Sequence, residues 1–165
     1  MTWRGTATPT DRIFAILPYL LPLSDAVFTG GAFFRYITQF PPLIPVATAI
    51  QLLALPAVFV QSLVPFFGSL VVFMLLIFLV VRNPRISHFI RFNTLQAILI
   101  GFIIFVCSLL ISVFQTPSLS LLTETLSNVV FLGGLGVVLY SMVQSGLGRY
   151  AEIPTLSEAV HMQVR

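Results

Sequence analysis

Long hydrophobic runs separated by short polar stretches dominate this chain of 165 residues. Residues 37–81 contain no charged side chain, and neither do residues 92–123. A helix of about 20 apolar residues crosses the hydrocarbon core of a bilayer, so each run holds at least one membrane span. A soluble fold of this length could not bury both runs. The pattern therefore predicts an integral membrane protein.

The runs predict an all-α, polytopic membrane protein with four transmembrane helices and an additional interfacial or re-entrant apolar segment. Two routes of the chain through the membrane lead to residue 82. In one route, residues 13–34 and 62–81 span the membrane, and 41–61 lies in the interface or forms a re-entrant segment. In the other, 13–23 lies flat and 43–81 forms a hairpin of two spans. Residues 92–114 and 126–143 supply the remaining spans in both routes. Four prolines and two glutamines within 41–61 favour the first route. The routes differ at Arg35, which lies outside in the first and inside in the second.

Arginines set the expected orientation. Arg82, Arg85 and Arg91 share one loop, Arg149 follows the last span, and only Glu124 lies between the third and fourth spans. The positive-inside rule places the 82–91 loop and both termini on the cytoplasmic or stromal side. We expect a polar N-terminal arm (1–11), a membrane domain (12–148) and a cytoplasmic tail (149–165).

Charged residues make up only 8% of the chain, against about 25% in soluble domains. The eight basic residues are all arginine and are not clustered on a polar surface, so nucleic-acid binding is not expected. No catalytic or metal-binding motif occurs, and we expect neither enzymatic activity nor a cofactor or metal. Cys107, the single cysteine, is interpreted as apolar packing.

Polar residues gather where the third span begins. Asn93 and Gln96 are i, i+3 neighbours on one helix face. Exposing both amides to lipid would cost free energy, so this face is expected to point away from lipid. In one interpretation, these residues only form the polar start of a helix. Their arginines reach lipid headgroups, and their amides form hydrogen bonds with the backbone or with a partner helix. The other interpretation is a partner-binding or gating surface made of Arg82, Asn83, Arg85, Arg91, Phe92, Asn93 and Gln96.

Two further features are candidates. Asp25 either marks a polar site in the membrane or ends the first span at the interface. The tail predicts a short helix from Leu156 with Leu156 and Val160 on one face, capped by Thr155 with Glu158 in capping-box spacing. Such a helix is too short to be stable alone, so it should dock on this protein's loop or on a partner.

Three stretches carry a family resemblance: LPYLLPLSD (17–25); VRNP (81–84) with FIRFN (89–93) and QAIL (96–99); and GRYAEIP (148–154) with SEAV (157–160). In this order they resemble the Tic-twenty family, the four-span subunit of the translocon at the inner envelope of chloroplasts, which has cyanobacterial homologues. The resemblance implies a helical membrane subunit of a protein-conducting complex and marks Tyr150, Glu152 and Pro154 as a tail motif. The family commonly carries an acid where this chain has Gly101, which weakens the case for conduction.

These observations predict a non-enzymatic membrane subunit of a protein translocation or insertion complex. The alternative is an assembly or scaffold subunit beside a photosynthetic membrane complex, followed by a small-solute channel or carrier. Expected partners are membrane lipids, other membrane subunits in a homo- or hetero-oligomer, and translocating polypeptides. Since no organellar leader precedes the motifs, we expect a cyanobacterial-type member in the plasma or thylakoid membrane.

Overall fold

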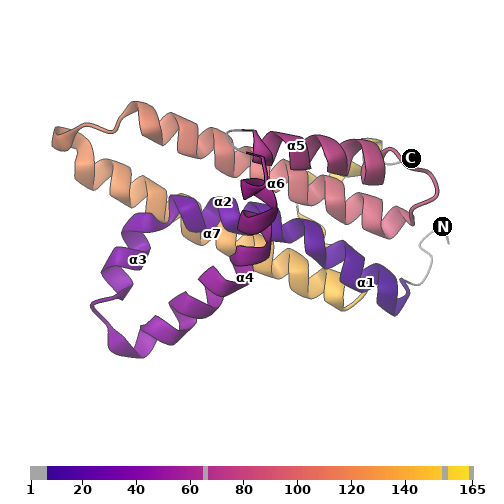
Figure 1. The fold of residues 1–165 in the computed structure, drawn as a ribbon, viewed down its shortest axis with the longest axis horizontal. Helices are drawn as coiled ribbons and strands as arrows, with labels where there is room; N and C mark the ends of the chain where they lie inside the picture. Colours follow the sequence, from indigo (N-terminus) through magenta and orange to yellow (C-terminus); the bar gives the residue numbers. More distant parts are fainter. Residues whose placement is uncertain (1–6, 65–66, 154–155, 164–165) are drawn as a thin grey trace.

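The computed structural model describes residues 7–64, 67–153 and 156–163, and these residues form helices without a strand (Figure 1). The predicted all-α class is confirmed. The α-helices are α1 (Pro9–Ile16), α2 (Leu20–Thr29), α3 (Gly31–Ile37), α4 (Ile44–Ser62), α5 (Gly68–Leu75), α6 (His88–Val113), α7 (Ser120–Gly146) and α8 (Leu156–Gln163). Shorter helical turns are η1 (Leu17–Tyr19), η2 (Pro41–Leu43), the π-helix η3 (Leu76–Val81) and η4 (Pro117–Leu119).

Four helical stretches in the described chain are long and apolar enough to cross a membrane: Pro9–Thr29, Pro41–Ser62, His88–Val113 and Pro117–Gly146. Gly68–Val81 is a shorter apolar helix. Its 14 residues reach about 21 Å, less than the roughly 30 Å of a hydrocarbon core. The predicted continuous span at 62–81 is therefore wrong. Ser62 ends α4, and the helix restarts at Gly68, where an added Cβ would collide with the Gln61 carbonyl.

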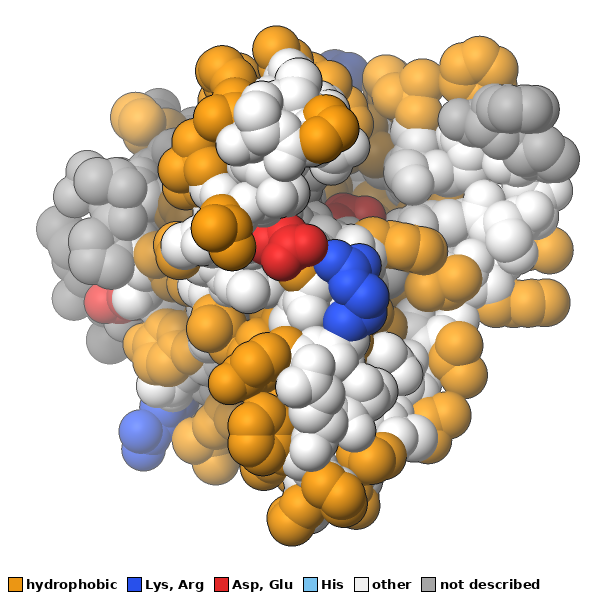
Figure 2. All heavy atoms as spheres, turned by 90° about the vertical axis from the view of Figure 1, so that its left-hand side faces the viewer, with side chains coloured by type: hydrophobic (Ala, Val, Ile, Leu, Met, Phe, Trp, Pro, Cys, Tyr) orange, Lys and Arg blue, Asp and Glu red, His pale blue; other side chains and the backbone are white. Residues whose placement is uncertain are grey.

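Arg35 and Glu124 define one end of the helical bundle. The Arg35 Nη2 lies 3.1 Å from the Glu124 Oε1, which joins the end of α3 to the start of α7. At the other end, the Ser87 hydroxyl donates to the Asp11 carboxylate at 3.1 Å, joining the start of α1 to the start of α6. We call this second end the arginine-loop end, after the arginine loop of residues 82–91. Figure 2 looks onto the first end, where an acidic and a basic side chain touch among hydrophobic ones.

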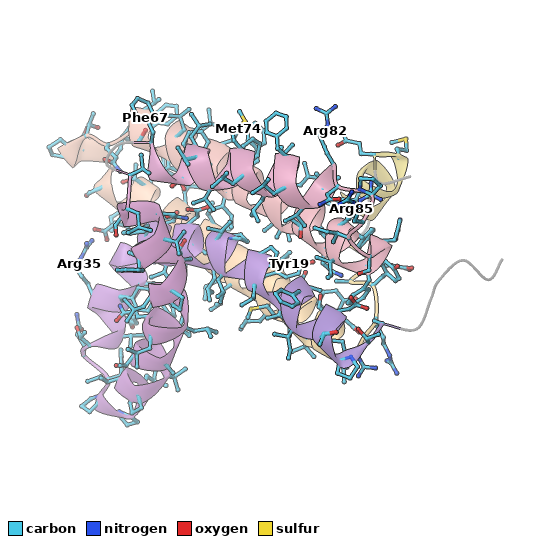
Figure 3. All side chains as sticks on the ribbon, turned by 45° about the vertical axis from the view of Figure 1, so that its right-hand side comes forward. Tyr19, Arg35, Phe67, Met74, Arg82 and Arg85 are labelled. Atoms are coloured by element: carbon cyan, nitrogen blue, oxygen red, sulfur yellow. The ribbon has the colours of Figure 1, made fainter. Side chains whose placement is uncertain are left out.

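The position of Arg35 decides between the two routes. Arg35 and Arg82 lie at opposite ends of the bundle (Figure 3), so the chain between them makes one net crossing. A hairpin of two spans at 43–81 would return Arg82 to the same end as Arg35, and this route is wrong. In this part of the chain, α3 and α4 project to one side of the bundle in Figures 1 and 3, and the 68–81 helix runs beside α6. With α1–α2, α6 and α7, the chain passes from one end of the bundle to the other four times, in agreement with four predicted spans.

The core lies where the N-terminal segment packs between α6 and α7. Tyr19, Leu23 and Ala26 are fully buried there, together with Phe131 and Val138 of α7. Small residues allow this close packing: a Cβ added at Gly30 would lie 2.6 Å from the Phe131 ring, and one added at Gly134 would lie 3.0 Å from Ile104. These contacts fix Tyr19 against the first turns of α6, where the candidate site lies.

Candidate functional site

A buried polar cluster of Tyr19, Asn93 and Ser145 joins three segments at the arginine-loop end. The Tyr19 hydroxyl donates to the Asn93 Oδ1 at 3.0 Å, and the Ser145 hydroxyl donates to the same atom at 2.7 Å. The Asn93 Nδ2 donates to the Phe89 carbonyl at 2.8 Å. All three side chains of the cluster are fully buried. Since a carbonyl oxygen has two lone pairs, the Asn93 Oδ1 is saturated by the two hydroxyls.

The tail is joined to α6 one turn further along. Gln96 is fully buried, and its Nε2 donates to the Ala151 carbonyl at 2.8 Å. Tyr150 packs edge-on against Phe89 and Phe92 with ring centroids 5.2 and 4.9 Å apart, and its hydroxyl lies 3.1 Å from the His88 Nδ1. The chain is therefore held against α6 directly after α7 ends.

Gly148 makes the reversal after α7 possible. Its φ is +74°, in the left-handed region that favours glycine, and the Arg149 N–H donates to the Gln144 carbonyl at 2.9 Å. An added Cβ would also lie 2.8 Å from the Arg12 Nε. The turn thus brings the tail back beside both α1 and α6.

The predicted tail helix is confirmed as α8, which packs on α6. Val160 is fully buried in a cluster with Val81, Phe92 and Leu95. Leu156 packs against the main core. The predicted cap Thr155 and the motif residue Pro154 lie outside the described residues, while Glu152 is exposed. The docking surface is the chain's own α6, beside the arginine loop.

The remaining loop residues divide into a helix cap and an exposed group. The Arg91 Nε donates to the Val81 carbonyl at 2.8 Å, which satisfies a backbone acceptor at the end of η3. Asn83 accepts from the Arg85 N–H at 3.0 Å and shapes the turn between them. Arg82 is exposed above the Phe78 ring, and Arg85 is exposed as well. Phe92, Asn93 and Gln96 face inward, so the seven candidate residues do not form one surface.

Asp25 lies away from this end, one turn before the end of the Pro9–Thr29 stretch. A Cβ added at Gly101 would lie 3.4 Å from its Oδ2, so the carboxylate faces α6. The Thr29 and Ser108 hydroxyls meet nearby at 2.7 Å. Asp25 is thus separate from the Tyr19–Asn93–Ser145 cluster.

Sequence reasoning missed several members of the site. Asn93 and Gln96 were singled out, but their partners Tyr19, Ser145 and Ala151 come from segments 52 to 74 residues away. The contact of Asp11 with Ser87 was also missed. A local signal existed: Thr8 and Asp11 form a capping box that starts α1, and Ser87 caps α6 through the Ile90 N–H.

Comparisons with known proteins show which family and which relatives this chain is similar to. A family model described as "Chloroplast import apparatus Tic20-like" matches residues 8–160. The chain is 44% identical to a Tic20 family protein of Synechocystis sp., over all of this chain and 99% of that protein. It is 33% identical to the Arabidopsis thaliana protein TIC 20-v, chloroplastic, over 94% of this chain and 71% of that protein. It is 32% identical to the Tic20 family protein Ycf60 of Gracilaria tenuistipitata var. liui, over 95% and 76%.

Proposed function

The chain belongs to the Tic20 family, as its motifs predicted, and from this premise we propose that it is a non-enzymatic membrane subunit of a protein translocation or insertion complex. The observation that carries the proposal is the match to an import-apparatus family over residues 8–160. The description of that family model refers to an import apparatus, which supports a role in transport. We propose no cofactor and no nucleic-acid partner.

The geometry supports a subunit that works with partners. At the arginine-loop end, hydrogen bonds join buried polar side chains to one another and to the backbone and stabilise the bundle, through Tyr19, Asn93, Gln96 and Ser145. Large apolar side chains remain exposed along α4, with Leu52 58% and Phe59 66% exposed. Lipids and other membrane subunits are suited to cover such a surface. A translocating polypeptide would then pass beside this chain, at a boundary with a partner.

We further propose that the arginine loop and both termini face the cytoplasm. The supporting observation is that the loop, the start of α1 and the tail share one end, which the positive-inside rule assigns to the cytoplasm. The relative from Synechocystis supports a cyanobacterial plasma or thylakoid membrane as the location.

The proposal is tested by site-specific photo-crosslinking during transport. A photoreactive residue replaces Arg82, which is exposed at the arginine-loop end, and a matched variant carries it at Leu122, exposed at the start of α7. A labelled precursor arrested by a folded domain should form an adduct at position 82, and the adduct should disappear after the precursor is chased through. Adducts to stationary subunits alone would overturn the proposal and favour the scaffold alternative.

A further inference from the structure

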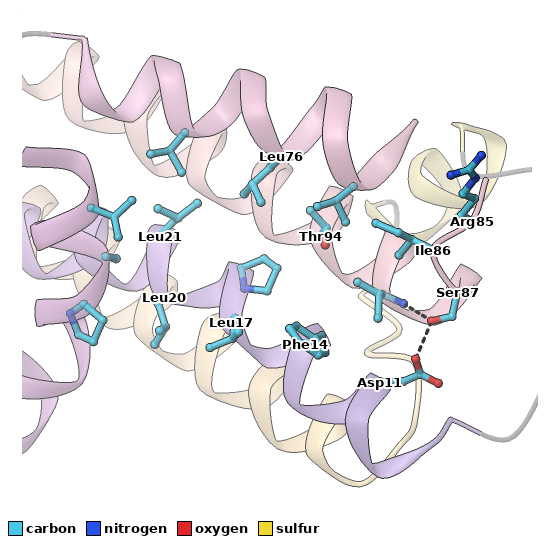
Figure 4. A pocket seen from close by; sticks show the side chains of 17 residues that line it. Asp11, Phe14, Leu17, Leu20, Leu21, Leu76, Arg85, Ile86, Ser87 and Thr94 are labelled. Carbon is cyan, nitrogen blue, oxygen red and sulfur yellow. Dashed lines mark hydrogen bonds between the residues drawn. The ribbon is translucent and has the colours of Figure 1, made fainter. Parts of the chain in front are cut away.

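A lateral cavity of about 790 Å³ lies beside the buried polar cluster (Figure 4). The N-terminal segment forms one wall with Leu17 and Leu21, and the 68–81 helix forms the opposite wall with Leu76 and Val80. Parts of α4 and α6 complete the lining. The cavity is therefore apolar along most of its length.

The end of the cavity nearest the arginine loop is polar. Asp11, Arg85 and Ser87 lie there, while the hydrophobic side chains continue away from them (Figure 4). The apolar membrane helix α6 begins at His88, so Arg85 and Ser87 stand just outside it, at the level of lipid headgroups. A charged mouth above an apolar interior matches the two parts of a phospholipid.

We propose that this cavity binds an anionic phospholipid, with one acyl chain between the two walls and the phosphate at Arg85. The inference goes beyond membership in a translocation complex, because it assigns a ligand to the chain itself.

The dimensions favour an acyl chain over a polypeptide helix. From Val80 to Val72 the lining descends eight residues, about 12 Å along a helix, which is within one leaflet. A helix about 10 Å wide and 30 Å long occupies roughly 2,400 Å³, three times the cavity. A cavity of 790 Å³ lies in the range of small-molecule sites.

The charges favour an anionic headgroup. Within the described residues no ion pair engages Arg85, and the arginine loop contains two further arginines and no acid. The Asp11 carboxylate does not neutralise the Arg85 guanidinium, because it is engaged elsewhere. It accepts hydrogen bonds from the Thr8 N–H and from the Ser87 hydroxyl, both at 3.1 Å. Arg85 thus remains available for a phosphate oxygen, a contact that arginine makes well.

A buried hydroxyl inside the cavity also lacks a partner. Thr94 is fully buried and lines the cavity from α6, and its Oγ1 has no hydrogen bond in the described chain. Six residues separate Thr94 from the start of α6, so it lies about 9 Å below the mouth. The ester carbonyls of a phospholipid lie below its phosphate and would accept this hydrogen bond. The ligand would satisfy a group that the protein leaves unsatisfied.

Native mass spectrometry of the purified full-length protein tests the site. The protein is exchanged into detergent with phosphatidylglycerol or phosphatidylcholine, and the fraction carrying one retained lipid is measured as detergent activation increases. We expect retention of phosphatidylglycerol over phosphatidylcholine. Leu76→Trp fills the cavity and should abolish retention, while Arg85→Gln should weaken it about tenfold through loss of a charge-assisted contact.

Matched controls separate this site from general lipid contact. Leu79→Trp changes the same helix at a side chain 60% exposed and outside the cavity lining, and Arg82→Gln removes a neighbouring charge outside the lining. Both should retain phosphatidylglycerol as the wild type does. Thr94→Val removes the unpaired hydroxyl with little change of shape and should lower retention without impairing folding.

Three results would overturn the proposal. Equal loss of lipid in Leu76→Trp and Leu79→Trp would indicate an adventitious lipid only. Equal retention of phosphatidylcholine would remove the role of Arg85. A Leu76→Trp variant that keeps its lipid but loses precursor crosslinks would assign the cavity to the polypeptide. The lipid measurement uses purified protein without precursor, so its failure is distinct from failure of the proposed transport function.

Discussion

Replacing Asn93 with leucine tests whether the buried polar cluster stabilises the bundle. Leucine has a similar size and suits a membrane helix, but it offers no acceptor to the Tyr19 and Ser145 hydroxyls, which now donate to the Asn93 Oδ1 at 3.0 and 2.7 Å. Ser145 lies on a helix and can turn to a backbone carbonyl in the preceding turn. Tyr19 can turn only to the neighbouring Ser141 and Ser145 hydroxyls, with which its own hydroxyl also interacts.

The size of the effect follows from these two losses. Hydrogen bonds between membrane helices contribute about 0.6 kcal/mol each on average, so losing two sets a lower value of about 1.2 kcal/mol. If the Ser141 and Ser145 hydroxyls leave the buried Tyr19 hydroxyl unsatisfied, the cost rises to about 3 kcal/mol. For a chain of this length each kcal/mol lowers the unfolding temperature by about 2–4 °C. We expect Asn93→Leu to unfold roughly 2–12 °C below the wild type.

Thermal unfolding in mild detergent, followed by circular dichroism and size-exclusion chromatography, measures this shift. Gln51→Leu is the matched control, because Gln51 is an exposed amide on α4 and its replacement should not destabilise the protein. Adding Tyr19→Phe to Asn93→Leu removes the orphaned hydroxyl, so the double variant should be no less stable than Asn93→Leu alone. Strictly additive losses would refute the reasoning.

Two further predictions concern the sides of the membrane on which positions 82 and 118 lie and the docking of α8. In a Cys107→Ala background, cysteines at Arg82 and Ser118 should react with an impermeant maleimide from opposite sides of oriented vesicles, and labelling from one side would contradict four crossings. Val160→Asp places a charge in a fully buried site and should release α8, measured as faster proteolysis of the tail, whereas Met162→Asp at a side chain 70% exposed should not. Equal cleavage of both variants would show that Val160 does not hold the tail.

The crossings were predictable because the bilayer imposes simple rules. The uncharged runs located α6 (His88–Val113) to within four residues, and the arginine loop leads into it. The predicted start of the last span was six residues late, because Glu124 lies inside α7 (Ser120–Gly146) and not in a loop before it. The tail helix was predictable from local spacing alone, since Leu156 and Val160 recur on one face. Each of these inferences depends on residues close together in the chain.

The division of 41–81 required tertiary information. Apolar composition does not distinguish a span from an oblique helix, and α4 was long enough for either. A contact between distant residues, the exposed ion pair of Arg35 with Glu124 at 3.1 Å, shows at which end of the bundle α3 ends. The break at Gly68 likewise depends on the approach of its backbone to the Gln61 carbonyl.

The candidate site shows the same division between local and long-range information. The spacing of Asn93 and Gln96 indicated correctly that their amides would avoid lipid. Whether they bind this chain or a partner depends on the position of Tyr19, Ser145 and Ala151, which no local pattern encodes. Tyr19 and Ala151 lie within the family motifs and Ser145 does not, and the resemblance assigned none of the three to a contact.

The internal use of these polar groups bears on how a protein of this kind could take part in transport. The Asn93 Oδ1 is saturated by contacts inside the bundle, and the lateral cavity is walled by residues such as Leu17 and Leu76. A polypeptide carries an unsatisfied backbone donor and acceptor at nearly every residue and needs a polar surface to cross a membrane. Among the described residues, exposed charged side chains lie at the two ends of the bundle, at the arginine-loop end and at the Arg35–Glu124 pair, and not along the spans. A conducting path would therefore require a second subunit, and co-purification of such a subunit is the condition for a translocation role.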